Sequence, residues 1–245
     1  PGDLPLLSDE DLASLGLPLG PRRRLQRALK EHPPPKAPEK PPLSVPDQER
    51  RNLTILFCDM ANSTSAAVAL DPEDLRTRFR TFRAACTAAI EAEEGFAAHR
   101  LGDGIMAYFG YPAASEDAAI CAVRAGHEIV AAVRRLEAPG GPMSVRVGIA
   151  TGLTVIEDFR DAQIDRDEIA TGATLALASR MQSMAEPGQV LLADTTRRLL
   201  RDQFALRSLG HQKLKGFSKP EEVWLSEGPR AGRAPGHVPG PDRMV

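Results

Sequence analysis

The order of strand-like and helix-like segments between residues 52 and 156 constrains the fold more than any other feature of the sequence. Short apolar runs rich in β-branched and aromatic residues predict strands, and long runs with apolar residues three and four apart predict helices. In chain order the predicted segments are a strand at 52–60, a helix at 72–94, a hairpin at 96–110, a helix at 115–136 and a strand pair at 143–156.

Strand–helix–strand–strand–helix–strand is the element order of a ferredoxin-like sandwich, in which helices cover one face of an antiparallel sheet. Pro72 is expected to open the first long helix and Ser115 to cap the second. The later segments predict a helix at 172–185, a strand at 188–194, a helix at 195–204 and a closing β segment near Trp224. We therefore predict an α+β fold with a ferredoxin-like βαββαβ core and extra elements after it.

Composition divides the 245 residues into four parts. Residues 1–32 contain two short helical patterns with too few apolar side chains for a stable core of their own. Residues 33–49 form a proline-dense, extended linker, and residues 50–228 form the main domain. The Gly/Pro-rich tail at 229–245 is expected to be disordered.

Charge, hydropathy and cysteine usage exclude several classes of partner. A formal net charge of -2 argues against a nucleic-acid surface built on bulk electrostatics. No apolar stretch approaches the ~18–20 residues that a membrane-spanning helix needs. Cys58, Cys86 and Cys121 lie in apolar segments without C-x-x-C spacing, which is typical of reduced core cysteines. We expect a cytoplasmic domain that binds neither nucleic acid nor membrane.

The first predicted strand ends in a carboxylate, Asp59, and the hairpin turn carries a second one, Asp103. Taken singly, Asp59 could cap the next helix and Asp103 could be the acid of an ordinary Asp-Gly turn. In a ferredoxin-like sheet, however, the first strand lies beside the hairpin, so the two carboxylates should be adjacent. Adjacent carboxylates repel unless a cation lies between them, and an all-oxygen pair suits Mg²⁺ or Mn²⁺. The spacing therefore favours a metal site.

The residues after Asp59, "MANSTS", form a turn that favours phosphate binding. Small side chains leave backbone N–H groups accessible, the hydroxyls of Ser63 and Thr64 add donors, and the N-terminus of a helix attracts anions. Two carboxylates beside a phosphate site suggest metal-assisted phosphoryl transfer. One ion would lower the pKa of an attacking hydroxyl while the other neutralises the leaving phosphates.

Four segments, "LFCDMANST", "LGDGIMAYFGYP", "LALASRMQSMAEPGQV" and "LGHQKLKGFSKPEEVW", together resemble the class III nucleotide cyclase catalytic domain. They occur in the same order and at similar spacing, and the resemblance covers residues 51 to about 226. Residues 5–31 look like the C-terminal half of a sterile alpha motif (SAM). A SAM segment followed by a cyclase domain is similar to a bacterial group of large signalling proteins.

The resemblance implies a dimer in which each active site lies across the interface. One subunit would bring Asp59 and Asp103 to hold two Mg²⁺ or Mn²⁺ ions, helped by the carbonyl of Met60. The ribose 3′-hydroxyl of a nucleoside triphosphate, with ATP favoured by the resemblance alone, would attack the α-phosphorus and release pyrophosphate. The residues implied in binding the nucleotide on this side are Asn62, Ser63, Thr64 and Gly102.

The other subunit would bring an Asn and an Arg four residues apart on one helix, which orient the ribose and stabilise charge on the phosphates. In this sequence the Arg is Arg180, but the Asn position is Ala176, whose methyl group cannot hydrogen-bond the ribose. Of the two positions that read the purine, the expected lysine is His99 and the expected Asp or Thr is Ile169. The departures from the family pattern therefore all fall on this half of the site.

Three functions follow from this pattern. The leading one is a cyclase that is weak as a homodimer and more active as a heterodimer whose partner supplies the missing polar groups. The alternative is a degenerate cyclase-like domain that binds nucleotide or dimerises as a regulatory module. A GGDEF-type diguanylate cyclase is disfavoured because the turn "LGDGI" lacks that motif.

Overall fold

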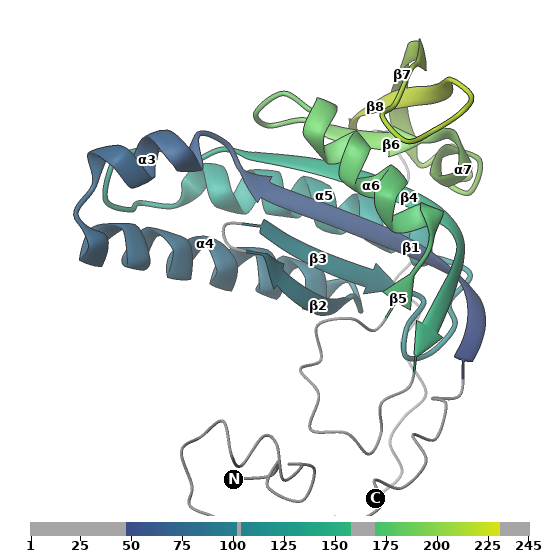
Figure 1. The fold of residues 1–245 in the computed structure, drawn as a ribbon, viewed down its shortest axis with the longest axis horizontal. Coiled ribbons are helices and arrows are strands. Elements are labelled where there is room, and N and C mark those ends of the chain that lie inside the picture. The colour runs from purple at the N-terminus through teal and green to yellow at the C-terminus, as the bar shows by residue number, and fades with distance from the viewer. Residues whose placement is uncertain (1–47, 102–103, 158–169, 231–245) are drawn as a thin grey trace, which may run out of the picture. The chain divides into compact units, whose positions relative to one another are not determined.

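The computed structural model describes residues 48–101, 104–157 and 170–230, all of which lie in the unit that spans residues 47–245. The predicted SAM-like segment, most of the linker and the tail beyond residue 230 lie outside these described residues. In chain order the elements are β1 (Gln48–Met60), α3 (Ser63–Ala69), α4 (Pro72–Ala92), β2 (Phe96–Leu101), β3 (Gly104–Phe109), α5 (Ala118–Arg135), β4 (Val145–Glu157), β5 (Ala170–Thr171), α6 (Ala173–Met184), β6 (Val190–Ala193), α7 (Asp194–Arg197), β7 (Phe204–Gln212) and β8 (Glu221–Pro229) (Figure 1).

The strands of the described residues form one sheet of order β2-β3-β1-β4-β6-β8-β7, with the two-residue β5 paired to β4. Its first four strands are antiparallel neighbours, in the order of a ferredoxin-like fold. Helices α4 and α5 cover one face, where Phe82, Ile90 and Ile129 pack against Leu56 and Cys58 of β1. The predicted α+β fold is therefore confirmed.

A second core lies on the opposite face of the same sheet, under α6 (Figure 1). Leu53 and Ile55 of β1 pack there with Met181 of α6, while the alternating residues Leu56 and Cys58 belong to the first core. Burial on both faces explains why the β1 run is apolar at successive positions rather than at every second one. The two layers of side chains fix which way each residue of β1 points.

The predicted strand pair at 143–156 is wrong, because β4 is one continuous strand of 13 residues. Its two glycines are not turn residues. A Cβ added at Gly148 would lie 2.0 Å from the backbone N of Gln182, and one at Gly152 would lie 2.8 Å from Oγ1 of Thr174. Glycine is needed at these positions because α6 lies directly on the strand.

Two helix boundaries also differ from the sequence prediction. Helix α5 begins at Ala118, and Ser115 caps no helix, since its Oγ accepts a hydrogen bond from the Asp117 N–H at 3.3 Å ahead of the first turn. The helix predicted at 195–204 shrinks to the four residues of α7, because the chain turns through Arg201 and Asp202 with positive φ.

A short helix not expected from the sequence, α3, stands between β1 and the long helix α4. The chain leaves the helical conformation at Leu70 and Asp71, both extended, immediately before Pro72. Proline disfavours a helical conformation in the residue before it, so α4 has to begin as a separate helix. The turn after Asp59 therefore leads into α3 and not into α4.

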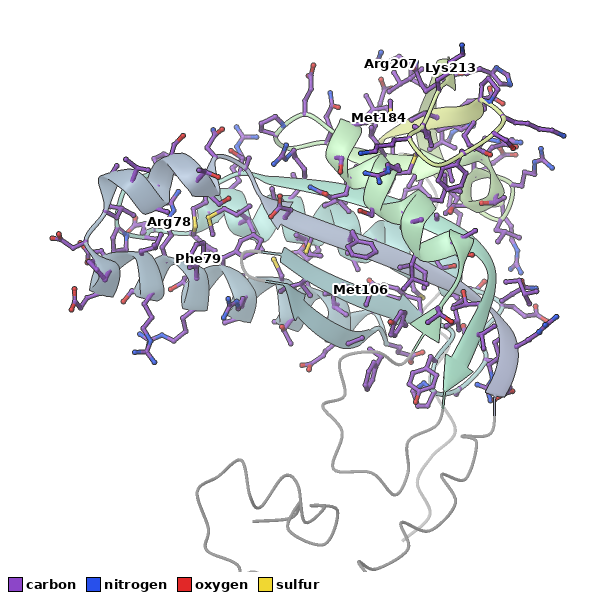
Figure 2. The ribbon with its side chains drawn as sticks, in the orientation of Figure 1. Arg78, Phe79, Met106, Met184, Arg207 and Lys213 are labelled. Carbon is purple, nitrogen blue, oxygen red and sulfur yellow. The ribbon has the colours of Figure 1, made fainter. Side chains whose placement is uncertain are left out.

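The second half of the sheet begins with β6, which pairs in parallel with β4 and antiparallel with β8. Strands β7 and β8 complete it as an antiparallel pair, called here the β7–β8 arm (residues 204–229). Met184, at the C-terminal end of α6, lies near this arm (Figure 2). No helix in the described parts of the chain is long and apolar enough to cross a membrane.

Candidate functional site

Asp59 lies one residue before the end of β1, on the face of the sheet that α6 covers. Its Cα pairs with Gly104 of β3 on one side and with Arg146 of β4 on the other. Gly104 is the first described residue after the hairpin turn, so Asp59 reaches the edge of the sheet at which the turn enters β3. Gly102 and Asp103 lie outside the described residues, and the pairing of two carboxylates stays a prediction.

Two donors contact the same oxygen of Asp59. Arg146 Nη2 lies 3.3 Å and Gln182 Nε2 lies 3.4 Å from Oδ2. Both distances are at the long end for hydrogen bonds, and the carboxylate remains 26% exposed. Partly exposed ion pairs of this kind are weak, so a cation can compete with them for the carboxylate.

The turn after Asp59 is anchored by its backbone. The N–H of Ala61 donates to the carbonyl of Ser144 at 2.9 Å, which ties the turn to the loop before β4. Asn62 follows in a left-handed conformation with φ 61°, and its carbonyl accepts the N–H of Ala66 in α3. Ser63 is half-buried and Thr64 exposed at the start of that helix. The structure thus brings these predicted residues together at one end of β1.

Met60 separates Asp59 from this turn. Its side chain is fully buried in the core beneath α4 and α5. Only the backbone carbonyl of Met60 is therefore available as a metal ligand, in the role that the resemblance implies.

The loop that supports the turn is itself held by Arg78, which projects from α4 on the side of α3 (Figure 2). The residue is 5% exposed, and its guanidinium donates to the carbonyls of Pro139 at 2.7 Å, Gly141 at 2.8 Å and Pro142 at 3.1 Å. Burial lowers the pKa of Arg78 from its usual value. The three carbonyl dipoles stabilise this charge inside the protein.

The other predicted half of the site lies on α6. Ala176 is exposed, and Arg180, one turn later, donates from Nε to the carbonyl of Lys215 at 3.2 Å, in the connection between β7 and β8. Arg180 is thereby held toward the β7–β8 arm. His99 occupies β2, where its backbone pairs with Met106, but its side chain and Ile169 lie outside the described part of the structure.

Sequence reasoning missed Arg146 and Gln182, which contact Asp59, and Arg78, which holds the loop before β4. The sequence does hint at a role for Arg146, because it is a single charge within the apolar run of β4, the strand expected beside β1. The sequence also hints that Arg78 is buried, since it lies four residues before the buried Phe82 on the same face of α4. Nothing in the sequence points to Gln182, because a glutamine near the end of a helix is common.

The ligands in place suit a hard cation. Within residues 48–101, 104–157 and 170–230, no three His, Cys, Asp or Glu side chains lie together as a ready metal cage. Mg²⁺ and Mn²⁺ do not require one, because they bind through one or two carboxylates and take their remaining ligands from water and substrate phosphates. The carboxylate of Asp59 and the carbonyl of Met60 fit this pattern.

The incomplete hydrogen bonding of Arg146 fits an anionic ligand. Its Nε is buried and has no hydrogen-bond partner among the described residues, while Nη2 makes only the long contact with Asp59. A guanidinium has five N–H donors in a fixed fork that matches phosphate oxygens. Arg146 therefore has donors to spare beside the turn that follows Asp59.

Two relatives cover most of the chain. An uncharacterized protein of Rhizobium meliloti is 38% identical over 203 residues, which make up 82% of this chain and 19% of that protein. A protein named adenylate cyclase, from Mycobacterium bovis, is 28% identical over 189 residues, or 76% of this chain and 42% of that protein. The chain spans less than half the length of either relative.

Solved cyclase structures share the fold. The adenylyl cyclase CyaB from P. aeruginosa superposes with a TM-score of 0.67 at 24% identity, covering 77% of this chain and all of that one. The guanylyl cyclase Cya2 gives a TM-score of 0.67 at 26% identity, covering 75% of this chain and 95% of that one. The family described as Adenylate and Guanylate cyclase catalytic domain matches residues 45–227. The chain belongs to this family of nucleotide cyclase catalytic domains.

Proposed function

We propose that this domain converts a nucleoside triphosphate, with ATP as the first candidate, into a 3′,5′-cyclic nucleotide and pyrophosphate in intracellular signalling. The observation that carries the proposal is the position of Asp59 in a cyclase-family fold. It is a partly exposed carboxylate at the end of β1, in weak contact with two donors and followed directly by the anchored turn. The name of the mycobacterial relative favours ATP.

In this mechanism Asp59, the Met60 carbonyl and, as we propose, Asp103 would hold the cations, and Asp59 would do so in competition with its contacts to Arg146 and Gln182. Two bound Mg²⁺ or Mn²⁺ ions would lower the pKa of the ribose 3′-hydroxyl and neutralise charge on the phosphates. The backbone N–H groups and hydroxyls of the turn at 62–64 bind phosphate oxygens. Arg146, which lies beside Asp59, would offer donors to the same phosphates.

The second half of each site would come from the α6 surface of another cyclase domain. There Arg180 stabilises charge on the phosphates, and Ala176 leaves the ribose without a hydrogen bond. Because orientation of the reacting groups supplies several kcal/mol in such reactions, a homodimer should be slow. The exposed methyl of Ala176 therefore favours a heterodimer in which another cyclase domain supplies the missing polar group, and it also favours a second candidate function, a degenerate regulatory module. His99 and Ile169 are the residues proposed to face the base.

The test is a turnover assay of the full chain with Mn²⁺ and each of ATP, GTP, CTP and UTP, with the product identified by mass spectrometry. Asp59→Asn should lower turnover by about 100-fold or more. Asp74→Asn is the matched control, because Asp74 is an exposed acid on α4 that loses the same charge. Equal turnover in Asp59→Asn and the control would refute the assignment of Asp59.

The same assay separates the two candidate functions. Turnover by the chain alone that rises in Ala176→Asn supports the cyclase with an incomplete ribose-binding half. No product with any of the four nucleotides, while nucleotide still binds, supports the degenerate module. Unchanged turnover in an active Ala176→Asn variant would contradict the role given to this position.

A further inference from the structure

Helix α6 is fixed to the sheet at one point of direct backbone contact. A Cβ at Gly148 of β4 would lie 2.0 Å from the N of Gln182 and 2.4 Å from the O of Ala178. No side chain lies between the two backbones at this point, so the turn of helix from Ala178 to Gln182 takes its position directly from β4. A shift of either element is passed on to the other, because close-packed groups cannot absorb it.

From this fixed turn Gln182 reaches the candidate metal ligand. Its Nε2 lies 3.4 Å from Oδ2 of Asp59, the same oxygen that Arg146 contacts from β4 at 3.3 Å. One carboxylate oxygen therefore joins β1, β4 and α6. A cation that binds this oxygen competes with the side-chain amide of Gln182 for it.

The same turn carries Arg180 on another side of the helix. Two residues of an α-helix are about 200° apart around its axis, so Gln182 and Arg180 point in different directions. Gln182 points to Asp59, and Arg180 donates to the carbonyl of Lys215 in the β7–β8 arm. This turn of α6 thus contacts the candidate metal ligand Asp59 on one side and the β7–β8 arm on another.

We propose that Gln182 is a positioning residue that couples Asp59 to Arg180. Cation binding at Asp59 would weaken the Gln182 contact, the end of α6 would shift together with β4, and the contact of Arg180 with Lys215 would change. The inference rests on the proposed function, because only in a cyclase dimer does the α6 surface serve the site of a second subunit. In such a dimer, metal occupancy of one site adjusts the phosphate-binding half of the other.

Hydrogen exchange of the full chain, followed by mass spectrometry with and without Mn²⁺ and a non-hydrolysable ATP analogue, tests this coupling without relying on turnover. In the wild type, Mn²⁺ should change exchange in the segment around Lys215 by about fivefold, the lower end of typical coupling between sites. In Gln182→Met, which keeps the length of the side chain and loses the donor, the change should disappear. Ser183→Ala, an exposed position on the same helix, should behave as the wild type.

Two results would overturn the coupling: a Mn²⁺-dependent change that persists in Gln182→Met, or no change in the wild type although Mn²⁺ binds. Failure of the proposed function has a different signature. It gives no product from any variant, whereas the exchange difference between wild type and Gln182→Met remains. In a homodimer that does turn over, Gln182→Met should also remove any cooperativity in the dependence of rate on Mn²⁺.

Discussion

Replacing Arg78 by methionine should lower the free energy of unfolding by about 3 kcal/mol. Arg78 is buried, and its guanidinium donates hydrogen bonds to three carbonyls of the loop between α5 and β4. Methionine fills the space of the side-chain stem, so the main loss is that of three hydrogen bonds to carbonyls, at about 1 kcal/mol each. The Nε of Arg78 has no partner within the described residues, so its removal costs no hydrogen bond.

Urea unfolding followed by circular dichroism measures this loss, with Arg78→Lys as the matched variant. Lysine keeps the charge but presents a compact ammonium group that cannot serve three spread carbonyls, so it should fall between the wild type and Arg78→Met. The midpoints of unfolding should shift, while the slope of the unfolding free energy against urea concentration stays constant, because the variants expose the same surface on unfolding. A difference below about 0.5 kcal/mol between Arg78→Met and the wild type would show that the guanidinium does not hold this loop.

Two further predictions concern buried titratable groups. His127 lies 2.7 Å from Oγ of Ser226, and burial lowers its pKa, so the folded protein resists protonation of His127 and loses stability as the pH falls below about 6.5. Between about pH 7.5 and about pH 5.5, the free energy of unfolding measured in urea should fall less in His127→Gln than in the wild type. An equal fall in both proteins would contradict the assignment. A hydrogen bond with Cys58, together with burial, raises the pKa of Cys86, and burial raises that of the more accessible Cys121. Iodoacetamide should therefore modify only Cys121 in the folded protein, as read by peptide mass spectrometry, and modification of the other two before unfolding would refute their burial.

The parts of the fold that follow local rules could be predicted from the sequence. The strand and helix periods between residues 52 and 156 predict the ferredoxin-like order, and that order alone places Asp59 beside the β2–β3 hairpin. The prediction worked because the neighbours of a strand in this topology are fixed by the order of the elements. No knowledge of side-chain packing was needed for it.

The parts that depend on long-range packing could not be predicted in the same way. The sequence predicts a strand pair at 143–156, because it does not reveal that α6 lies on the chain at Gly148 and Gly152. Gln182 meets Asp59 across 123 positions of the chain, and such a contact depends on the register of α6 on β4. The hold of Arg78 on three carbonyls likewise depends on the path of a loop some 60 residues away.

The long pairing of β1 with β4 has a consequence for how the domain forms. The two strands are in register from Gln48 with Glu157 to Met60 with Val145. Each residue pair therefore closes a loop of roughly a hundred residues, and the chain loses that conformational entropy before the pairing stabilises it. Contacts of this kind form late and slow the folding of a domain. During synthesis, Asp59 would leave the ribosome well before Arg146 exists to meet it. The candidate site therefore forms only in the complete α+β domain, and a shorter N-terminal fragment would lack residues that contribute to it.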